Sequence, residues 1–267
     1  MSVRVGVVGV AGRMGVELVK AIAAEPAAQL AAAIDRAGGK AIGQDAGTLA
    51  GGAPCGVLVG TELNAVLRDV DVIIDFSRAE AVGSTTQACA KAGVPLMIGT
   101  TGLDSDTQQQ IDTAAARIPL LVSANTSLAL NVLLELVRRA AEALPAGYDI
   151  EIFETHHRRK VDAPSGSALA LGEAAAAGRG EPLQRPVGLT GAQPGPRGGG
   201  IGFAVARGGD VVGEHEVRFL GEGEQLRLAH VATDRAIFAR GALAAALWLV
   251  GRAPQRYRMA DFLQKIQ

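Results

Sequence analysis

Aromatic residues are scarce and the net charge is close to zero, and both shortages bear on nucleic-acid binding. Aromatic side chains make up 3% of the 267 residues, too few for a platform that stacks the bases of a single strand. Lys and Arg number 26 against 27 Asp and Glu, which gives a formal net charge of -1. A nucleic-acid-binding domain is normally strongly basic, so we expect no nucleic-acid partner.

Cysteine and long apolar runs are scarce as well. The two cysteines, Cys55 and Cys89, belong to no CxxC pair, so the sequence indicates neither a disulfide framework nor a metal site. The longest apolar run covers residues 242–250, far short of the roughly 20 residues that a membrane-spanning helix needs. The N-terminus is broken by glycine and lacks a cleavage-site pattern, unlike a signal peptide. We therefore expect a cytoplasmic protein with reduced cysteines, no metal and no membrane partner.

Aliphatic residues are abundant and are arranged in alternating patterns. Apolar residues make up 48% of the chain and charged residues 20%, which permits a sizeable core. In the first half, short β-branched runs alternate with segments of helical periodicity, which predicts an α/β fold with a doubly wound parallel sheet of the Rossmann type. The expected strands span residues 3–8, 29–34, 71–76, 94–98 and 120–123, and the expected helices span residues 13–24, 79–92 and 105–117.

The pattern changes after residue 125 and predicts an α+β second domain. Three strand-like runs are separated by GGD and GEGE turn signals, so we expect hairpins in an open mixed or antiparallel sheet. An exposed sheet of this kind commonly pairs with another subunit. The expected elements are helices at 128–143, 167–177 and 236–250, strands at 148–154, 201–207, 211–219 and 225–233, and a Gly- and Pro-rich loop at 178–200.

A glycine-rich loop follows the first expected strand. Gly9, Gly12 and Gly15 have the spacing GxxGxxG, and the strand before and helix after them are the context of a dinucleotide-binding loop. Glycine lets the backbone approach a pyrophosphate, which N–H groups and the positive end of the helix dipole stabilise. Arg13 would add a charge-assisted contact. The alternative is a plain turn before a helix packed through glycine.

The second expected strand ends at Asp35, and Arg36 follows it. A carboxylate at this position accepts hydrogen bonds from the adenosine ribose, which favours NAD. A guanidinium beside it holds the 2′-phosphate of NADP. The pair predicts use of NADH, NADPH or both, and the alternative is an exposed ion pair.

Small polar segments follow two later strands, at residues 99–102 (GTTG) and 123–126 (SANT). The carboxyl ends of parallel strands border the ligand crevice of a doubly wound sheet, although each segment is also an ordinary cap or turn. The candidate cofactor-binding residues are therefore Gly9, Val10, Ala11, Gly12, Arg13, Met14, Asp35, Arg36, Gly99, Thr100, Thr101, Ser123, Ala124, Asn125 and Thr126.

The densest group of reactive side chains lies at residues 156–160 (HHRRK), just before a PSGS segment at an expected helix start. Five consecutive cationic or proton-bearing groups repel one another unless solvent or an anion balances them. A histidine there can act as a general acid near neutral pH, and Lys160 can neutralise a carboxylate or help to donate a proton. Together with a helix N-terminus, the run favours an anionic di-acid as substrate. The alternative is a solvated basic loop. His215 and His230, in expected strands, are assigned structural roles.

Three segments resemble the dihydrodipicolinate reductase (4-hydroxy-tetrahydrodipicolinate reductase) family. They are residues 8–15 (VGVAGRMG), 99–102 (GTTG) and 154–169 (ETHHRRKVDAPSGSAL), of which the last is the most specific. The tail, including residues 207–215 (RGGDVVGEH), is also similar, so the resemblance covers essentially the whole chain.

The resemblance implies an organisation and a reaction. Residues 1–126 would form a Rossmann-type domain completed by the C-terminal segment 235–267, and residues 127–234 a substrate domain whose sheet mediates a homotetramer. The implied reaction is hydride transfer from NADH or NADPH to a small cyclic dicarboxylate, with loss of its 4-hydroxyl, in the diaminopimelate route to lysine.

By position, the resemblance makes His156 the catalytic proton donor and Lys160 its partner. It assigns the substrate carboxylates to His157, Gly166 and Ser167. The family usually has Thr in place of Ser167, which keeps the hydroxyl.

A second departure from the family is Thr126, where it usually has Phe, so we expect different packing beside the nicotinamide. Two alternatives to the reductase are left open. One is a related nicotinamide-dependent enzyme for another di-acid, such as an amino-acid dehydrogenase. The other is a regulator that binds NAD(P) without turnover, which would leave the HHRRK run and the PSGS segment without a task.

Overall fold

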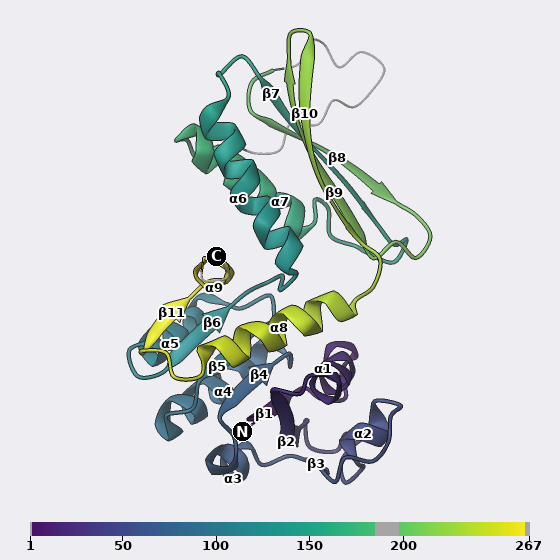
Figure 1. The fold of residues 1–267 in the computed structure, drawn as a ribbon, viewed down its shortest axis with the longest axis vertical. Helices are drawn as coiled ribbons and strands as arrows, with labels where there is room; N and C mark the ends of the chain where they lie inside the picture. The colour runs from purple at the N-terminus through teal and green to yellow at the C-terminus, as the bar shows by residue number, and fades with distance from the viewer. Residues whose placement is uncertain (1, 185–197, 265–267) are drawn as a thin grey trace. The chain divides into compact units, whose positions relative to one another are not determined.

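The computed structural model describes residues 2–184 and 198–264, which form two compact units (Figure 1). The first unit contains the chain up to Leu128 and again from Arg235 onward, and the second contains Ala129–Asp234. The first unit has two hydrophobic core clusters, and the second has one. No helix in the described parts of the chain is both long and apolar enough to cross a membrane.

A seven-stranded sheet forms the centre of the first unit. Its strands are β1 (Val3–Val8), β2 (Ala28–Ile34), β3 (Val59–Gly60), β4 (Val72–Asp75), β5 (Leu96–Ile98), β6 (Pro119–Val122) and β11 (Gln255–Tyr257). They lie in the order β11–β6–β5–β4–β1–β2–β3, and each neighbouring pair is parallel. This confirms the predicted doubly wound sheet. The winding direction reverses between β1 and β4, and such sheets bind ligands outside the strands' carboxyl ends at that point.

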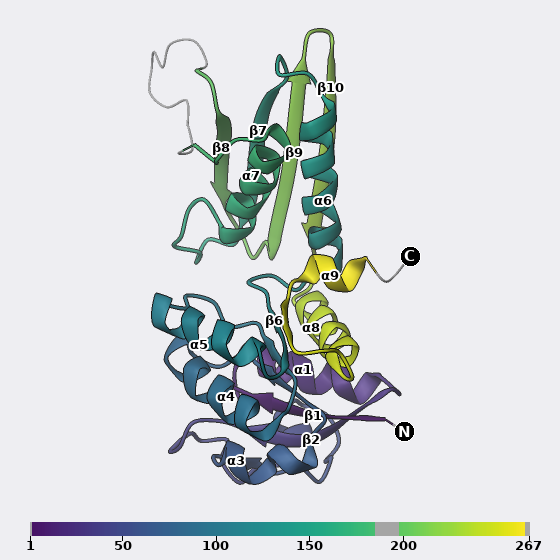
Figure 2. The same cartoon turned by 90° about the vertical axis from the view of Figure 1, so that its left-hand side faces the viewer.

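Helices cover both faces of this sheet (Figure 2). The main ones are α1 (Arg13–Ala24), α4 (Ala79–Ala92), α5 (Ser105–Ala115) and α8 (Ala236–Leu249). Helices α1 and α8 pack in one core cluster, whereas α4 and α5 pack in the other. Successive strand residues point to opposite faces, so β4 sends Ile74 into the first cluster and Ile73 into the second.

Six short elements of the first unit have no counterpart in the sequence analysis. They are α2 (Ala46–Leu49), α3 (Leu63–Val66), the 3-10 helix η1 (Leu67–Asp69) and α9 (Met259–Leu263), together with β3 and β11. Each is five residues or shorter, and periodicity identifies a helix only over a longer window. The parallel pairing of β11 with β6 joins segments far apart in the chain, which a local pattern does not show.

The second unit contains a four-stranded mixed sheet. Its strands are β7 (Asp149–His156), β8 (Ile201–Arg207), β9 (Gly213–Gly221) and β10 (Glu224–Ala232), in the order β10–β9–β7–β8. Strand β9 pairs antiparallel with β10 and β7, and β8 pairs parallel with β7. The prediction of a mixed sheet is confirmed, but the expected hairpin between β8 and β9 is wrong because β7 lies between them. The glycine turn after β8 instead bonds to the end of β7, where Gly208 N–H donates to His156 O at 2.9 Å.

Two helices, α6 (Leu128–Ala143) and α7 (Gly166–Arg179), share a core cluster with this sheet. Helix α6 has the expected bounds, and α7 begins one residue before the expected start. Ser165 caps α7, since its hydroxyl accepts the Ala168 N–H at 3.1 Å. The Gly- and Pro-rich stretch predicted as a loop at 178–200 falls largely outside the described residues.

Gly15 gives a test of the packing between α1 and the glycine loop. In most helices, replacing Gly by Ala stabilises by about 1 kcal/mol. A Cβ at Gly15 would lie 2.3 Å from Gly9 O and 2.5 Å from Val10 Cα. We therefore expect Gly15→Ala to lower the free energy of unfolding by about 2 kcal/mol in urea titrations. The control is Gly147→Ala, where a Cβ meets nothing within 4 Å. A stabilised Gly15→Ala protein would contradict the packing described.

Candidate functional site

The glycine loop after β1 separates two adjoining cavities of the first unit. Gly9 has a φ of 84°, and a Cβ there would lie 2.6 Å from Phe76 O, so no other residue fits. The cavities have volumes of about 740 Å³ and 700 Å³ and share Gly12, Phe76, Ser77 and Arg78 as wall residues. Both sizes are typical of ligand sites.

Backbone N–H groups at the start of α1 face this region. The N–H groups of residues 9–12 donate hydrogen bonds to backbone carbonyls and to the Asp35 carboxylate, at 2.8–3.2 Å. The N–H groups of Arg13 and Met14 have no acceptor among the described residues, and no side chain caps α1. Two unbonded donors at the positive end of a helix suit a pyrophosphate.

The structure gathers the cofactor-binding candidates around these cavities. Every one except Val10 lines at least one of them. Val10 is buried in the core, and its N–H donates to Ile34 O at 3.2 Å, so its role in cofactor binding stays a prediction.

The smaller cavity has an aromatic wall residue that the sequence analysis missed. Phe238 of α8 lines it beside Thr126, whose hydroxyl donates to Phe238 O at 2.6 Å. A Cβ at Gly241 would lie 1.8 Å from Thr126 O, so this glycine allows α8 to approach. No signal in the sequence connects Phe238 with a site more than a hundred residues earlier.

Strand β7 carries the reactive cluster of the second unit. Its alternate residues Ile150 and Ile152 are buried in the core, and Glu154 and His156 continue the same buried row. Core packing uses apolar side chains, so a carboxylate and an imidazole in this row indicate a functional role rather than a packing role.

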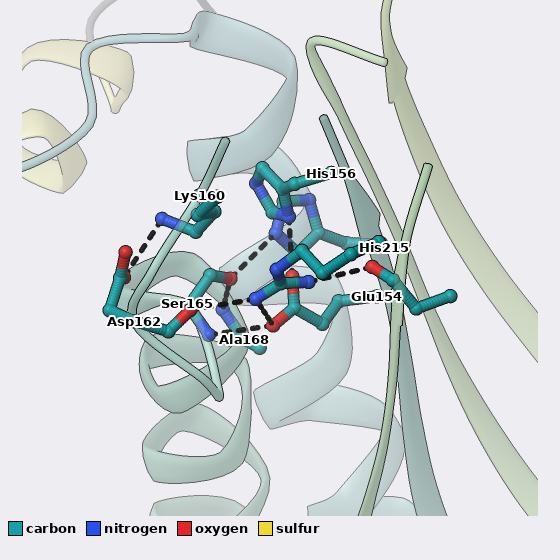
Figure 3. Close-up of polar contacts among 9 residues, drawn as sticks. Glu154, His156, Lys160, Asp162, Ser165, Ala168 and His215 are labelled. Carbon is teal, nitrogen blue, oxygen red and sulfur yellow. Dashed lines mark hydrogen bonds and ion pairs between the residues drawn. The ribbon is translucent and has the colours of Figure 1, made fainter. Parts of the chain in front are cut away.

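Glu154 is 3% exposed and is held from three directions (Figure 3). One oxygen contacts His156 Nδ1, and the other accepts the Ser165 N–H at 2.8 Å and Arg207 Nη2 at 3.0 Å. Burial raises the pKa of Glu154, but the hydrogen bonds from Arg207 and Ser165 and the nearby positive charges outweigh burial and hold its pKa below the usual range. The carboxylate is therefore ionised at neutral pH.

His156 is held at Nδ1, so its other nitrogen, Nε2, is the atom that can act. A Cβ at Gly213 would lie 3.0 Å from Nε2, so the absence of a side chain there leaves space beside this atom. Burial lowers the pKa of His156, Glu154 raises it, and Lys160 and Arg207 lower it again, with a net pKa below the usual value. Glu154 thus keeps a buried imidazole able to take up a proton.

His215 lies beside this pair, although the sequence analysis assigned it only a structural role. Its ring centroid is 5.1 Å from that of His156 at an interplanar angle of 76°, and its Nε2 lies 3.2 Å from Ser165 Oγ. Burial, reinforced by the charge of His156, lowers the pKa of His215 to about 4. His215 is therefore neutral near pH 7 and does not compete for the proton of His156.

The remaining candidates lie around the same cluster. Lys160 Nζ donates to Asp162 Oδ2 at 2.8 Å, and Nδ1 of His157 is buried with no partner among the described residues. Gly166 and Ser167 form the first turn of α7, whose N-terminal N–H groups suit a carboxylate. Ligand atoms of a carboxylate and two imidazoles lie within 4.8 Å of one another, but a guanidinium already binds that carboxylate, so the group favours proton transfer over a metal ion.

A parallel sheet with a glycine loop at its switch point, two adjoining cavities and a buried acid–base pair defines a dinucleotide-dependent oxidoreductase. Models of the dihydrodipicolinate reductase N-terminus and C-terminus match residues 3–126 and 129–263. The chain belongs to the dihydrodipicolinate reductase family.

Relatives and solved structures agree with this assignment. The chain is 49% identical to a 4-hydroxy-tetrahydrodipicolinate reductase of Thiobacillus denitrificans, over 98% of this chain and 99% of the relative. It is 48% identical to one of Anaeromyxobacter dehalogenans, over 97% of each. A dipicolinate-bound dihydrodipicolinate reductase from Paenisporosarcina sp. TG-14 superposes with a TM-score of 0.77 at 25% identity, covering 97% of this chain and 98% of that one. An amine dehydrogenase from Mycobacterium smegmatis shares the fold, with a TM-score of 0.63 at 15% identity over 96% and 95% of the two chains.

The low pKa of His215 predicts a pH-dependent stability. Its pKa is about 4 in the folded protein and about 6.5 in the unfolded chain, so the unfolded state binds more protons between these values. The free energy of unfolding must fall as the pH is lowered through this window. Between pH 7.5 and pH 5, we expect the wild type to lose about 2 kcal/mol more than His215→Gln in urea titrations. Equal losses in the two proteins would show that His215 is not buried in its neutral form.

Proposed function

We propose that the chain reduces 4-hydroxy-tetrahydrodipicolinate, a small cyclic dicarboxylate, with NADH or NADPH in the diaminopimelate route to lysine. The observation that carries the proposal is the buried Glu154–His156 pair within a cationic cluster. The relatives named for this reaction, nearly half identical over almost the full chain, support the substrate. The Paenisporosarcina relative has dipicolinate bound, itself a cyclic dicarboxylate.

The nicotinamide cofactor supplies the hydride when it is bound. The first unit fits such a group because the glycine loop carries no side chain at Gly9 or Gly15, where a Cβ would meet backbone atoms at less than 3.0 Å, and the bare backbone can therefore approach a pyrophosphate. The free N–H groups of Arg13 and Met14 would hold the pyrophosphate. Asp35 and Arg36 line the larger cavity and would hold the adenosine ribose, while residues 99–101 and 123–126 line the smaller one and would border the nicotinamide.

The second unit supplies the groups for the substrate. The two carboxylates of the substrate need positive charge and N–H donors. Lys160, His157 and the N-terminus of α7 at Gly166 and Ser167 would provide them. The Lys160 ammonium is paired with Asp162, so a substrate carboxylate would share or replace this anion.

The overall reduction consumes one proton and releases the 4-hydroxyl as water, so an acid is required. His156 supplies this proton from Nε2, while Glu154 binds Nδ1 and stabilises the imidazolium. Arg207 and the Ser165 N–H keep Glu154 ionised in turn. Lys160 contributes positive charge that favours proton release from His156.

The proposal includes a homotetramer formed through the sheet of the second unit and a location in the cytoplasm. Strand β10 is an edge strand, and Leu226 and Val231 on it are 39% and 60% exposed. Another nicotinamide-dependent enzyme acting on a different di-acid is the second candidate, but the amine dehydrogenase shares only the fold. A regulator without turnover leaves the cationic cluster unexplained.

A coupled assay tests the function. The substrate would be generated from pyruvate and aspartate semialdehyde by its synthase, and oxidation of NADH and NADPH followed by absorbance. We expect rapid oxidation by the wild type, and His156→Gln or Lys160→Ala to lower kcat by about 100-fold or more. Nucleotide affinity should stay unchanged, because neither residue lies in the first unit.

The matched control is Arg159→Ala, which removes an exposed cation of the same basic run. We expect its kcat to stay close to that of the wild type. Folded protein that binds nucleotide but oxidises neither cofactor would contradict the proposed function. Unchanged turnover in both site variants would contradict the assigned roles.

Glu154→Gln separates positioning from simple structural support. The amide keeps the size of the side chain but removes the charge that raises the pKa of His156. His156 then loses its proton at a lower pH, so the kcat–pH profile should shift toward lower pH by about one pH unit. Glu151→Gln, on the opposite face of β7, should leave the profile in place. A lower kcat with an unshifted profile would contradict the role of the Glu154 charge.

A further inference from the structure

Three cations line the larger cavity of the first unit, and two of them have no task in the proposed function. They are Arg36, Lys40 and Arg78, all exposed. The charged group of each has neither an ion pair nor a hydrogen bond within the described parts of the chain. The cavity thus has cationic groups that no protein group neutralises by contact.

Two carboxylates line the same cavity, and one of them is engaged with the backbone. Asp35 accepts the Ala11 N–H at one oxygen and the Arg36 N–H at the other, both at 2.8 Å. Glu62 accepts the Thr61 hydroxyl at 3.2 Å. Neither forms an ion pair with the three cations, so their positive charge is available to a ligand.

The chain between Arg36 and Gln44 is a series of tight turns that fixes Lys40 close to Arg36. The Gly39 N–H donates to Arg36 O at 3.2 Å, which reverses the chain directly before Lys40. The Gln44 side-chain amide then donates to Lys40 O at 2.7 Å. Gln44 lines the same cavity, so the backbone of Lys40 is held against its wall.

We propose that Lys40 determines cofactor specificity: together with Arg36 it binds the 2′-phosphate of NADPH, and the chain prefers NADPH to NADH. This inference rests on the proposed function, since it concerns the cofactor of the same site. A phosphate monoester carries nearly two negative charges at neutral pH. The guanidinium can bind two of its oxygens, and the ammonium adds a compact second charge. NADH has a neutral hydroxyl at this position, so Lys40 contributes to NADPH binding alone.

Equilibrium binding tests this without turnover. The wild type, Lys40→Met and Lys40→Arg would be titrated with NADPH and NADH by fluorescence, and with 2′,5′-ADP and 5′-AMP by calorimetry. We expect the wild type to bind NADPH about tenfold more tightly than NADH. Lys40→Met should lose about five- to tenfold in affinity for NADPH and 2′,5′-ADP, with NADH and 5′-AMP unchanged. Lys40→Arg should retain the preference because it keeps the charge.

The matched control is Lys91→Met, which removes an exposed lysine at the end of α4, outside the cavity. It should change none of the four affinities. An unchanged NADPH affinity in Lys40→Met, or an equal loss for NADH, would overturn the inference while leaving the reductase intact. Folded wild type that bound none of the four nucleotides would overturn the proposed function as well.

Discussion

The buried carboxylate of Glu154 is the interaction on which the second unit depends. It joins three segments: its own strand β7, the start of α7 through Ser165, and the end of β8 through Arg207, which is more distant in the chain. An isolated buried carboxylate would be costly, and these donors compensate for the loss of water. The same charge orients His156 and keeps the imidazole able to take up a proton. The packing of the second unit and the proposed acid–base chemistry therefore both depend on this side chain.

In the first unit, close backbone packing around the glycine loop is the main structural constraint. The backbone approaches of Gly9 and Gly15 exclude any side chain, and they hold α1 with its N-terminal N–H groups directed at the cavities. In the proposed function, the glycine loop would bind the pyrophosphate that all these dinucleotides share. Asp35, Arg36 and Lys40 line the larger cavity and would distinguish NADPH from NADH.

Much of this organisation could be predicted from the sequence, because alternating apolar patterns and glycine spacing are local. Five of the seven strands of the first unit's sheet and the bounds of α6 follow from such patterns, whereas β3 and β11 do not. Arg207 and His215 could not be predicted as site residues. Their positions depend on strand pairing, in which β8 places Arg207 opposite His156 and β9 places His215 opposite Glu154. A hairpin between β8 and β9 would not have placed both Arg207 and His215 beside β7, so the expected pairing did not predict their contacts with Glu154 and His156.

The protonation state of His156 is the most direct test of the central claim, that Glu154 holds this imidazole as the proton donor. It can be measured by NMR of protein with 15N-labelled histidine, titrated with pH, with His156 assigned by comparison with His156→Gln. We expect Nδ1 to keep its proton toward Glu154 throughout, while Nε2 gains and loses the second proton. A neutral form with the proton on Nε2 and a bare Nδ1 would contradict it.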